Sequence, residues 1–171
     1  MNYHNILHDN MLNGEGLRVV LFVSGCEHHC KGCHNPQTHD PASGIEFTQA
    51  EEDEIFEQLS KPYIRGLTLT GGDPLHPSNY KTLLALCKKV KANFPKKDIW
   101  LYTGYRVEDI PDEMKDIFQY IDTIVDGRFV EELKDVNLPY VGSSNQRIIR
   151  LNKRISATLG SGIFNGVKSN D

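Results

Sequence analysis

The sequence predicts an α/β protein whose mostly parallel sheet forms a partial, open (β/α) barrel. Three observations lead to this fold class. Apolar runs typical of buried strands alternate with segments of helical periodicity, an order that favours parallel strands joined by right-handed crossovers. The predicted strands end in turn residues such as glycine and aspartate. About four or five such units fit into the chain, too few to close an eight-stranded barrel.

The first half of the chain supplies two strands and two helices. Residues 17–23 form a near-continuous apolar run, which is typical of a strand buried on both faces. Thr48, with Glu51 three residues later, is a capping box that starts a helix. Residues 67–70 are a second strand, which stops at a glycine-rich turn. A helix follows over about residues 78–94, with an apolar stripe at helical spacing.

The second half continues the alternation. Residues 99–102 are the third strand and stop at Thr103. Pro111 suits the first turn of a helix, and apolar residues then recur at i, i+3, i+4 and i+7. Residues 121–125 are the fourth strand, and residues 148–151 are a possible fifth.

Composition and charge are those of an ordinary globular protein. The 171 residues are 39% hydrophobic and 25% charged, and a net charge of −4 provides no strong field for nucleic acid. The longest apolar run is about seven residues, whereas a membrane span needs ~20. The N-terminus lacks the pattern of a secretion signal. We expect a cytoplasmic protein that binds neither nucleic acid nor membrane, with one domain over residues 1–155 and a poorly ordered polar tail over residues 156–171.

Three of the four cysteines lie close together, in a C-x3-C-x2-C spacing made by Cys26, Cys30 and Cys33. Disulfide frameworks spread cysteines along the chain, so clustered thiols in an intracellular protein indicate a metal centre. Three thiolates are one fewer than the four that close an electron-transfer iron–sulfur cluster, and an open position is typical of a catalytic site. The alternative is a structural zinc site whose fourth ligand is one of the nearby histidines His28, His29 and His34.

Other polar signals also follow predicted strands. Gly71-Gly72-Asp73-Pro74 ends the second strand, Thr103 ends the third and Asp126 ends the fourth. Because parallel α/β folds place their sites at this carboxyl edge, we expect these residues and the cysteine triplet to line one pocket. The two glycines let backbone approach a ligand, and the Asp73 carboxylate can meet an ammonium group. The fourth cysteine, Cys87, lies on the apolar stripe of its helix and is expected to be a buried hydrophobe.

The cysteine motif after the first strand resembles the signature of the radical S-adenosylmethionine superfamily. Residues 71–74 resemble the Gly-Gly-Glu-Pro segment of that superfamily, with aspartate in place of glutamate. The resemblance implies a 4Fe–4S cluster on the three cysteines, with S-adenosylmethionine chelating the open iron. Reductive cleavage of that cofactor then yields a 5′-deoxyadenosyl radical, which abstracts a hydrogen atom.

The resemblance also implies which residues contact the cofactor, namely Gly32, Cys33, His34, Gly71, Gly72, Asp73 and Thr103. His34 stands where the superfamily usually has an aromatic residue near the adenine, and its flat ring can still stack. Thr103 is either a ribose contact or a turn residue at the end of a strand.

Longer stretches are similar to the family of proteins that activate anaerobic ribonucleoside-triphosphate reductase; they are residues 1–4, 21–26, 71–77, 100–105, 125–129 and 142–146. This resemblance implies an oxidoreductase that generates a glycyl radical on the large reductase subunit and takes its electron from a flavodoxin-like donor. Two alternatives remain, another small radical enzyme (a different glycyl-radical activase or a deazapurine synthase) and a non-enzymatic zinc or iron–sulfur module. Asp126 and residues 142–146 either bind the partner or shape turns.

Overall fold

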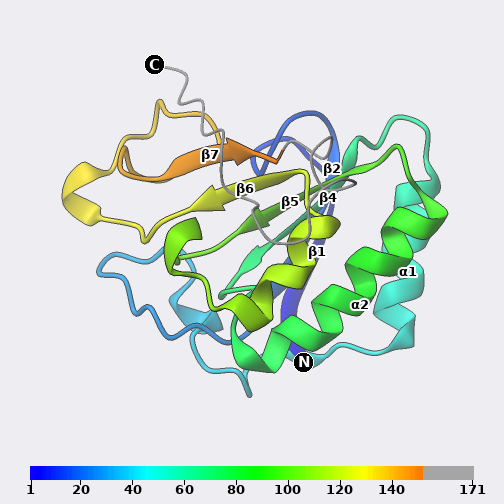
Figure 1. Cartoon of the computed structure of the whole chain (residues 1–171), viewed down its shortest axis with the longest axis horizontal. Coiled ribbons are helices and arrows are strands. Elements are labelled where there is room, and N and C mark those ends of the chain that lie inside the picture. Colours follow the sequence, from blue (N-terminus) through cyan, green and yellow to red (C-terminus); the bar gives the residue numbers. More distant parts are fainter. Residues whose placement is uncertain (152–171) are drawn as a thin grey trace.

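A seven-stranded mixed sheet, covered on one face by two α-helices, forms the centre of the computed structural model, which describes residues 1–151 (Figure 1). The helices are α1 (Gln49–Ser60) and α2 (Pro77–Asn93). Across the sheet the strands run β3 (Ile45–Glu46), β1 (Asn2–Asn10), β2 (Arg18–Val23), β4 (Gly66–Gly71), β5 (Asp98–Tyr102), β6 (Thr123–Asp126) and β7 (Arg147–Arg150).

The four central strands β2, β4, β5 and β6 are parallel, and one row of the register runs Val20, Thr68, Trp100 and Thr123. Strands β1, β3 and β7 are antiparallel to their neighbours. The sheet begins at β3 and ends at β7 without closing, which confirms the predicted open, mostly parallel α/β fold.

Helix α1 begins as its capping box predicts. The Glu51 carboxylate accepts a hydrogen bond from the Thr48 backbone N–H at 2.6 Å, and the Thr48 hydroxyl oxygen accepts one from the Ala50 N–H at 3.3 Å. Without these two side-chain acceptors, the backbone N–H groups of Thr48 and Ala50 would lack a partner at the start of the helix.

The structure differs from the sequence predictions at three elements. The long N-terminal strand β1 and the short β3 were not predicted, because β1 is half-buried and mixes histidine and asparagine with its apolar residues. The helix predicted after Pro111 is a 3-10 helix, Asp112–Gln119, which presents Ile117 and Phe118 to the core. Three further short 3-10 helices cover Pro36–Thr38, Val107–Asp109 and Glu131–Leu133.

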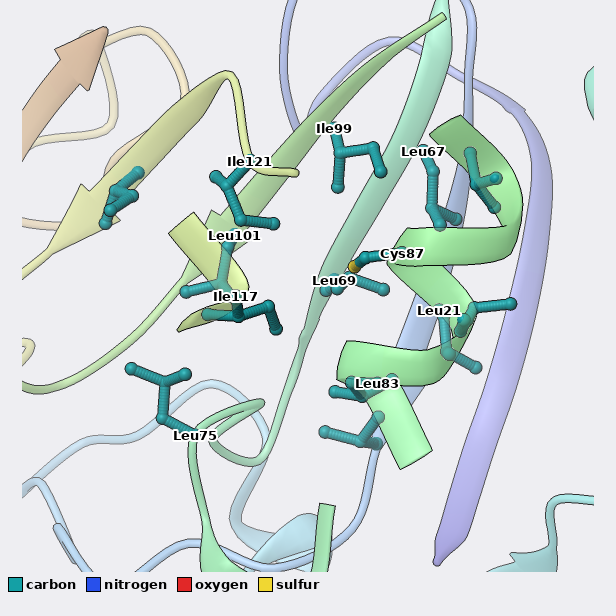
Figure 2. Close-up of a cluster of buried hydrophobic side chains, with 14 of the residues drawn as sticks. Leu21, Leu67, Leu69, Leu75, Leu83, Cys87, Ile99, Leu101, Ile117 and Ile121 are labelled. Atoms are coloured by element: carbon teal, nitrogen blue, oxygen red, sulfur yellow. The ribbon is translucent and has the colours of Figure 1, made fainter. Parts of the chain in front are cut away.

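Alternation along the strands separates the hydrophobic core from a second face. Leu21, Leu69 and Leu101 point to the helical side of the sheet. There Leu21 and Leu69 lie beside α2, and Leu101 lies beside Ile117 (Figure 2). The intervening residues, such as Thr70 and Tyr102, point to the opposite face, away from the helices. Cys87 is fully buried within the core, which confirms its predicted role as a small hydrophobe.

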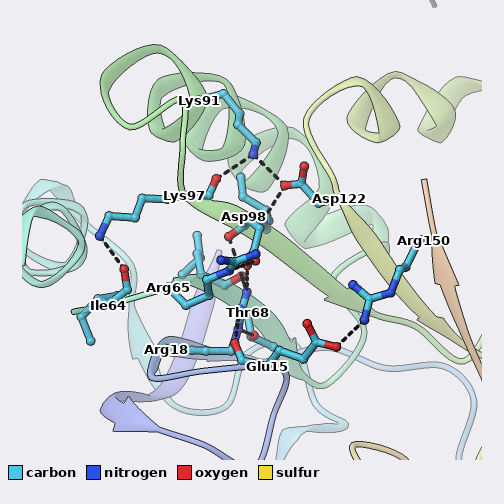
Figure 3. A network of polar contacts seen from close by, with 12 residues as sticks. Glu15, Arg18, Ile64, Arg65, Thr68, Lys91, Lys97, Asp98, Asp122 and Arg150 are labelled. Atoms are coloured by element: carbon cyan, nitrogen blue, oxygen red, sulfur yellow. Dashed lines mark hydrogen bonds and ion pairs between the residues drawn. The ribbon is translucent and has the colours of Figure 1, made fainter. Parts of the chain in front are cut away.

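A polar network closes the amino edge of the parallel strands (Figure 3). The Arg18 guanidinium, fully buried, lies 2.6 Å from Asp98 Oδ1 and donates to the Thr68 hydroxyl and the Leu67 carbonyl. Burial lowers the pKa of Arg18, and the Asp98 carboxylate opposes that shift. Lys91 of α2 donates to the Asp122 carboxylate at 2.6 Å, which ties α2 to the residue before β6.

No helix in residues 1–151 has the length and apolar character needed to cross a bilayer. The predicted domain boundary at residues 155 and 156, and the polar tail after it, lie outside the described residues.

Candidate cofactor site

The face of the sheet away from the helices carries a hollow of about 580 Å³. Its walls include the carboxyl ends of β4, β5 and β6, the loop after β2 and the segment 136–142. All three clustered cysteines line it, together with Gly71, Gly72 and Thr103. The structure thus brings together residues that follow separate strands in the sequence, as expected for the carboxyl edge of parallel strands.

The cysteine loop is anchored at its start by backbone hydrogen bonds. The Gly25 N–H donates to the Thr38 carbonyl at 2.7 Å, and the Cys26 N–H donates to the His39 carbonyl at 3.0 Å. Farther along, the Cys33 N–H donates to the Cys30 carbonyl at 3.1 Å, forming a tight turn between two of the thiols. The three half-buried thiols therefore face the hollow from a single loop.

The chemistry of these thiols fits an iron–sulfur cluster. Burial raises the pKa of Cys26 to about 11, and the nearby Cys30, Cys33 and Asp73 contribute to the same shift. Crowded thiolates of this kind are stabilised by a cationic centre. No three His, Cys, Asp or Glu side chains within residues 1–151 converge on a position for a single metal ion. A 4Fe–4S cluster does not require such convergence, because each of the three thiolates binds a different iron atom.

The Gly-Gly-Asp-Pro turn is joined directly to the cysteine loop. The Gly72 N–H donates to the Val23 carbonyl and the Asp73 N–H donates to the Gly25 carbonyl, each at 2.7 Å. A Cβ atom on Gly72 would overlap the Gly25 carbonyl oxygen, so only glycine permits this approach.

The Asp73 side chain is 2% exposed and is absent from the lining of the hollow. Its carboxylate accepts hydrogen bonds from the Leu75 N–H (2.8 Å), the Gly104 N–H (3.0 Å) and the Thr103 hydroxyl (2.9 Å). The fourth partner is His28 Nε2, at 2.6 Å. A direct contact between Asp73 and a cofactor remains a prediction, and the structure shows protein donors at this carboxylate.

The remaining predicted contacts occupy different positions. His34 lines the hollow, and its ring lies 4.7 Å from the ring of Phe129, centroid to centroid. Thr103 also lines the hollow, but its hydroxyl hydrogen is donated to Asp73. Gly32 adopts the left-handed conformation and does not line the hollow. Sequence reasoning missed the aromatic wall made by Phe129 and Tyr102, although both lie in stretches that resemble the family.

Asp126 and residues 142–146 shape turns in this structure. The buried Asp126 carboxylate accepts from the Val107 N–H at 2.9 Å and from Arg147 Nε at 2.9 Å. The Gln146 side-chain oxygen accepts from the Gly142 N–H at 2.8 Å, and its amide donates to the Gly127 carbonyl at 3.0 Å. These bonds hold the segment that forms one wall of the hollow.

Comparison with known proteins agrees with this site. The family model described as a 4Fe-4S single cluster domain matches residues 12–149. The chain is similar to the anaerobic ribonucleoside-triphosphate reductase-activating protein of Vibrio cholerae, at 47% identity over 88% of this chain and 98% of the relative. The phage T4 protein of the same name is 48% identical over 86% of this chain and 93% of the relative. The Escherichia coli K12 protein of that name is 44% identical over 88% and 99%, respectively. The chain therefore belongs to the family of anaerobic ribonucleoside-triphosphate reductase-activating proteins.

Proposed function

We propose that this protein is a radical S-adenosylmethionine enzyme that activates an anaerobic ribonucleoside-triphosphate reductase by generating a glycyl radical on it. The observation that carries the proposal is the cysteine triplet, which lines a hollow at the carboxyl edge of the sheet in a chain of this family.

Cys26, Cys30 and Cys33 would hold the 4Fe–4S cluster and leave one iron without a protein ligand. When bound together, the cluster and S-adenosylmethionine supply a reductive cleavage that yields a radical able to take a hydrogen atom from a glycine. The chain contributes position, because hydrogen transfer requires the reacting atoms in near-contact. Backbone at Gly71 and Gly72 forms the floor beside the cysteines, and His34 offers a flat ring at the wall.

Exposed apolar side chains at the mouth of the hollow favour a protein substrate over a small molecule. Three exposed apolar side chains line it, namely Met11 (64% exposed), Leu12 (79%) and Val136 (84%). Apolar groups exposed together at the rim of a site are typical of a protein-binding surface. We propose that the glycine-bearing loop of the large reductase subunit enters here. A flavodoxin-like electron donor and a cytoplasmic location are part of the same proposal.

The test is electron paramagnetic resonance on a mixture of the anaerobically reconstituted protein, S-adenosylmethionine, reductant and the reductase. The expected result is a glycyl doublet on the reductase that disappears when the receiving glycine is replaced by alanine. Cofactor cleavage without a partner radical, accompanied by turnover of a small molecule, would instead support another radical enzyme. Zinc without iron or sulfide in the anaerobically purified protein would support a structural module.

A further inference from the structure

We propose that Asp73 positions the cysteine loop by binding His28, and that it does not contact the ammonium group of the cofactor. Both residues act through their neighbours and are positioning residues. The inference rests on the proposed function only in taking the cysteine loop as the holder of the cluster.

The Asp73 carboxylate is buried among donors from the protein. An ionised carboxylate offers about four acceptor positions. Here four donors from the protein bind the carboxylate: Oδ2 accepts from His28, Thr103 and Gly104, and Oδ1 accepts from Leu75. With 2% of the residue exposed, the carboxylate has no open side toward the hollow. A cofactor ammonium could reach it only by displacing part of the protein that encloses it.

The His28 side chain is largely buried at the wall of the hollow. Its side chain is 6% exposed, and its ring lies edge-on to Tyr105 with centroids 4.7 Å apart. A Cβ atom on Gly104 would overlap the His28 ring, so the turn after β5 fits closely around it. Because a carboxylate can only accept, the imidazole must donate from Nε2, which fixes the orientation of the ring.

The contact between His28 and Asp73 matters for the cluster because of where His28 lies in the cysteine loop. His28 lies midway between Cys26 and Cys30, so fixing its ring fixes the backbone that carries both thiols. The neighbouring His29 is exposed and stands against His39, with ring centroids 5.0 Å apart. His29 is therefore a matched control, with the same residue type one position along but without the Asp73 contact.

The start of the loop has a separate anchor. Asn79 of α2 donates to the Ser24 carbonyl at 2.7 Å and to the Asp73 carbonyl at 3.0 Å, and the Asp73 N–H bonds the Gly25 carbonyl. The two of these bonds that involve Asp73 use its backbone atoms. Replacing the carboxylate with an amide preserves these backbone bonds. It changes only the side-chain acceptor, which binds His28 in the middle of the loop and also Leu75, Thr103 and Gly104.

The experiment uses the full chain, reconstituted anaerobically without the reductase, and measures two quantities. The first is the rate of iron release to a chelator, and the second is the affinity of the cluster-loaded protein for S-adenosylmethionine. The variants are His28→Ala, His28→Gln, Asp73→Asn, the double variant His28→Ala/Asp73→Asn and the control His29→Ala. Far-ultraviolet circular dichroism verifies that each variant is folded.

We expect His28→Ala and Asp73→Asn each to speed iron release about tenfold, as fits the loss of one hydrogen bond to a charged group. The double variant should release iron no faster than the faster single variant, because both substitutions remove the same contact. His28→Gln, whose amide can donate in place of Nε2, should restore most of the retention. His29→Ala should behave as the wild type. Affinity for S-adenosylmethionine should stay within about threefold in Asp73→Asn.

Two results would overturn the inference. One is wild-type iron retention in Asp73→Asn with S-adenosylmethionine affinity reduced tenfold or more, which would place the carboxylate on the cofactor. The other is additive effects of the two substitutions on iron release. If Asp73→Asn does not fold, the contrast of His28→Ala with His28→Gln and His29→Ala decides the question. None of these measurements needs a glycyl radical, so failure of the proposed function would show itself separately.

Discussion

Replacing each of the four cysteines by alanine should separate cluster binding from core packing. Cys87 is fully buried between α2 and the sheet, near Leu69 and Leu83 (Figure 2). Losing its sulfur removes one heavy atom from the core, a change comparable to Ile→Val, and should cost about 1 kcal/mol. For a chain of this length that corresponds to a fall in Tm of about 3 °C.

The triplet should show the opposite behaviour. Cys26, Cys30 and Cys33 are half-buried at the edge of a hollow, so alanine at any of them should change the stability of the cluster-free protein by less than ~0.5 kcal/mol. Each of these substitutions should abolish the intact cluster, because the site has only three cysteine ligands and the cluster needs all of them.

Two assays on the same four variants test the reasoning. Iron and sulfide per chain, measured after anaerobic reconstitution, report the cluster, and urea unfolding of the cluster-free protein reports the core. The expected pattern is full iron with reduced stability for Cys87→Ala, and unchanged stability with lost iron for the other three. A Cys87→Ala protein of wild-type stability that lost its cluster would refute the assignment, as would an intact cluster in any triplet variant.

Three further predictions follow from the geometry. Arg18→Met should lower the free energy of unfolding by about 3 kcal/mol in urea titrations, because it removes a fully buried guanidinium with its ion pair to Asp98 and its hydrogen bonds to Thr68 and Leu67. Arg65→Ala, at an exposed side chain that also pairs with Asp98, should cost under ~1 kcal/mol. Gly72→Ala should reduce iron retention after reconstitution, since the added methyl overlaps the backbone of the cysteine loop; unchanged retention would show that the two loops are not tightly joined. Leu12→Asp and Val136→Asp should weaken binding to the reductase about tenfold in a titration while leaving S-adenosylmethionine cleavage by the isolated protein intact, and loss of both activities together would contradict a docking role.

The elements that the sequence predicted well are those whose signals are local. The strand over residues 17–23 was readable from its apolar run, and α1 was readable from its capping box. Strand β1 was missed because its half-buried surface tolerates polar residues, which removes the alternation that marks a strand. The 3-10 geometry of Asp112–Gln119 was missed because a short apolar repeat suits both kinds of helix.

The features of the site that escaped prediction depend on contacts between residues distant in sequence. His28 and Asp73 are 45 residues apart, and nothing near either residue signals their pairing. The mouth of the hollow is similar, since Leu12 and Val136 come from segments without periodicity. Arg18 is similar, because the charge that it places within an apolar run is balanced by Asp98, which lies 80 residues later.

Register explains why one aspartate can serve two loops. Strand β4 lies between β2 and β5, and its last residues pair with Phe22 and Val23 of β2, so the chain leaving β4 emerges beside the cysteine loop. On its other side Thr103 directly follows strand β5, and its hydroxyl donates to the same carboxylate. A residue just after the central strand is therefore placed to bind both neighbours at once. A slip of one residue in β4 would turn Asp73 to the opposite face and release both loops. The buried packing of this strand, set by Leu67 and Leu69, is thus what fixes the geometry of the metal-binding loop.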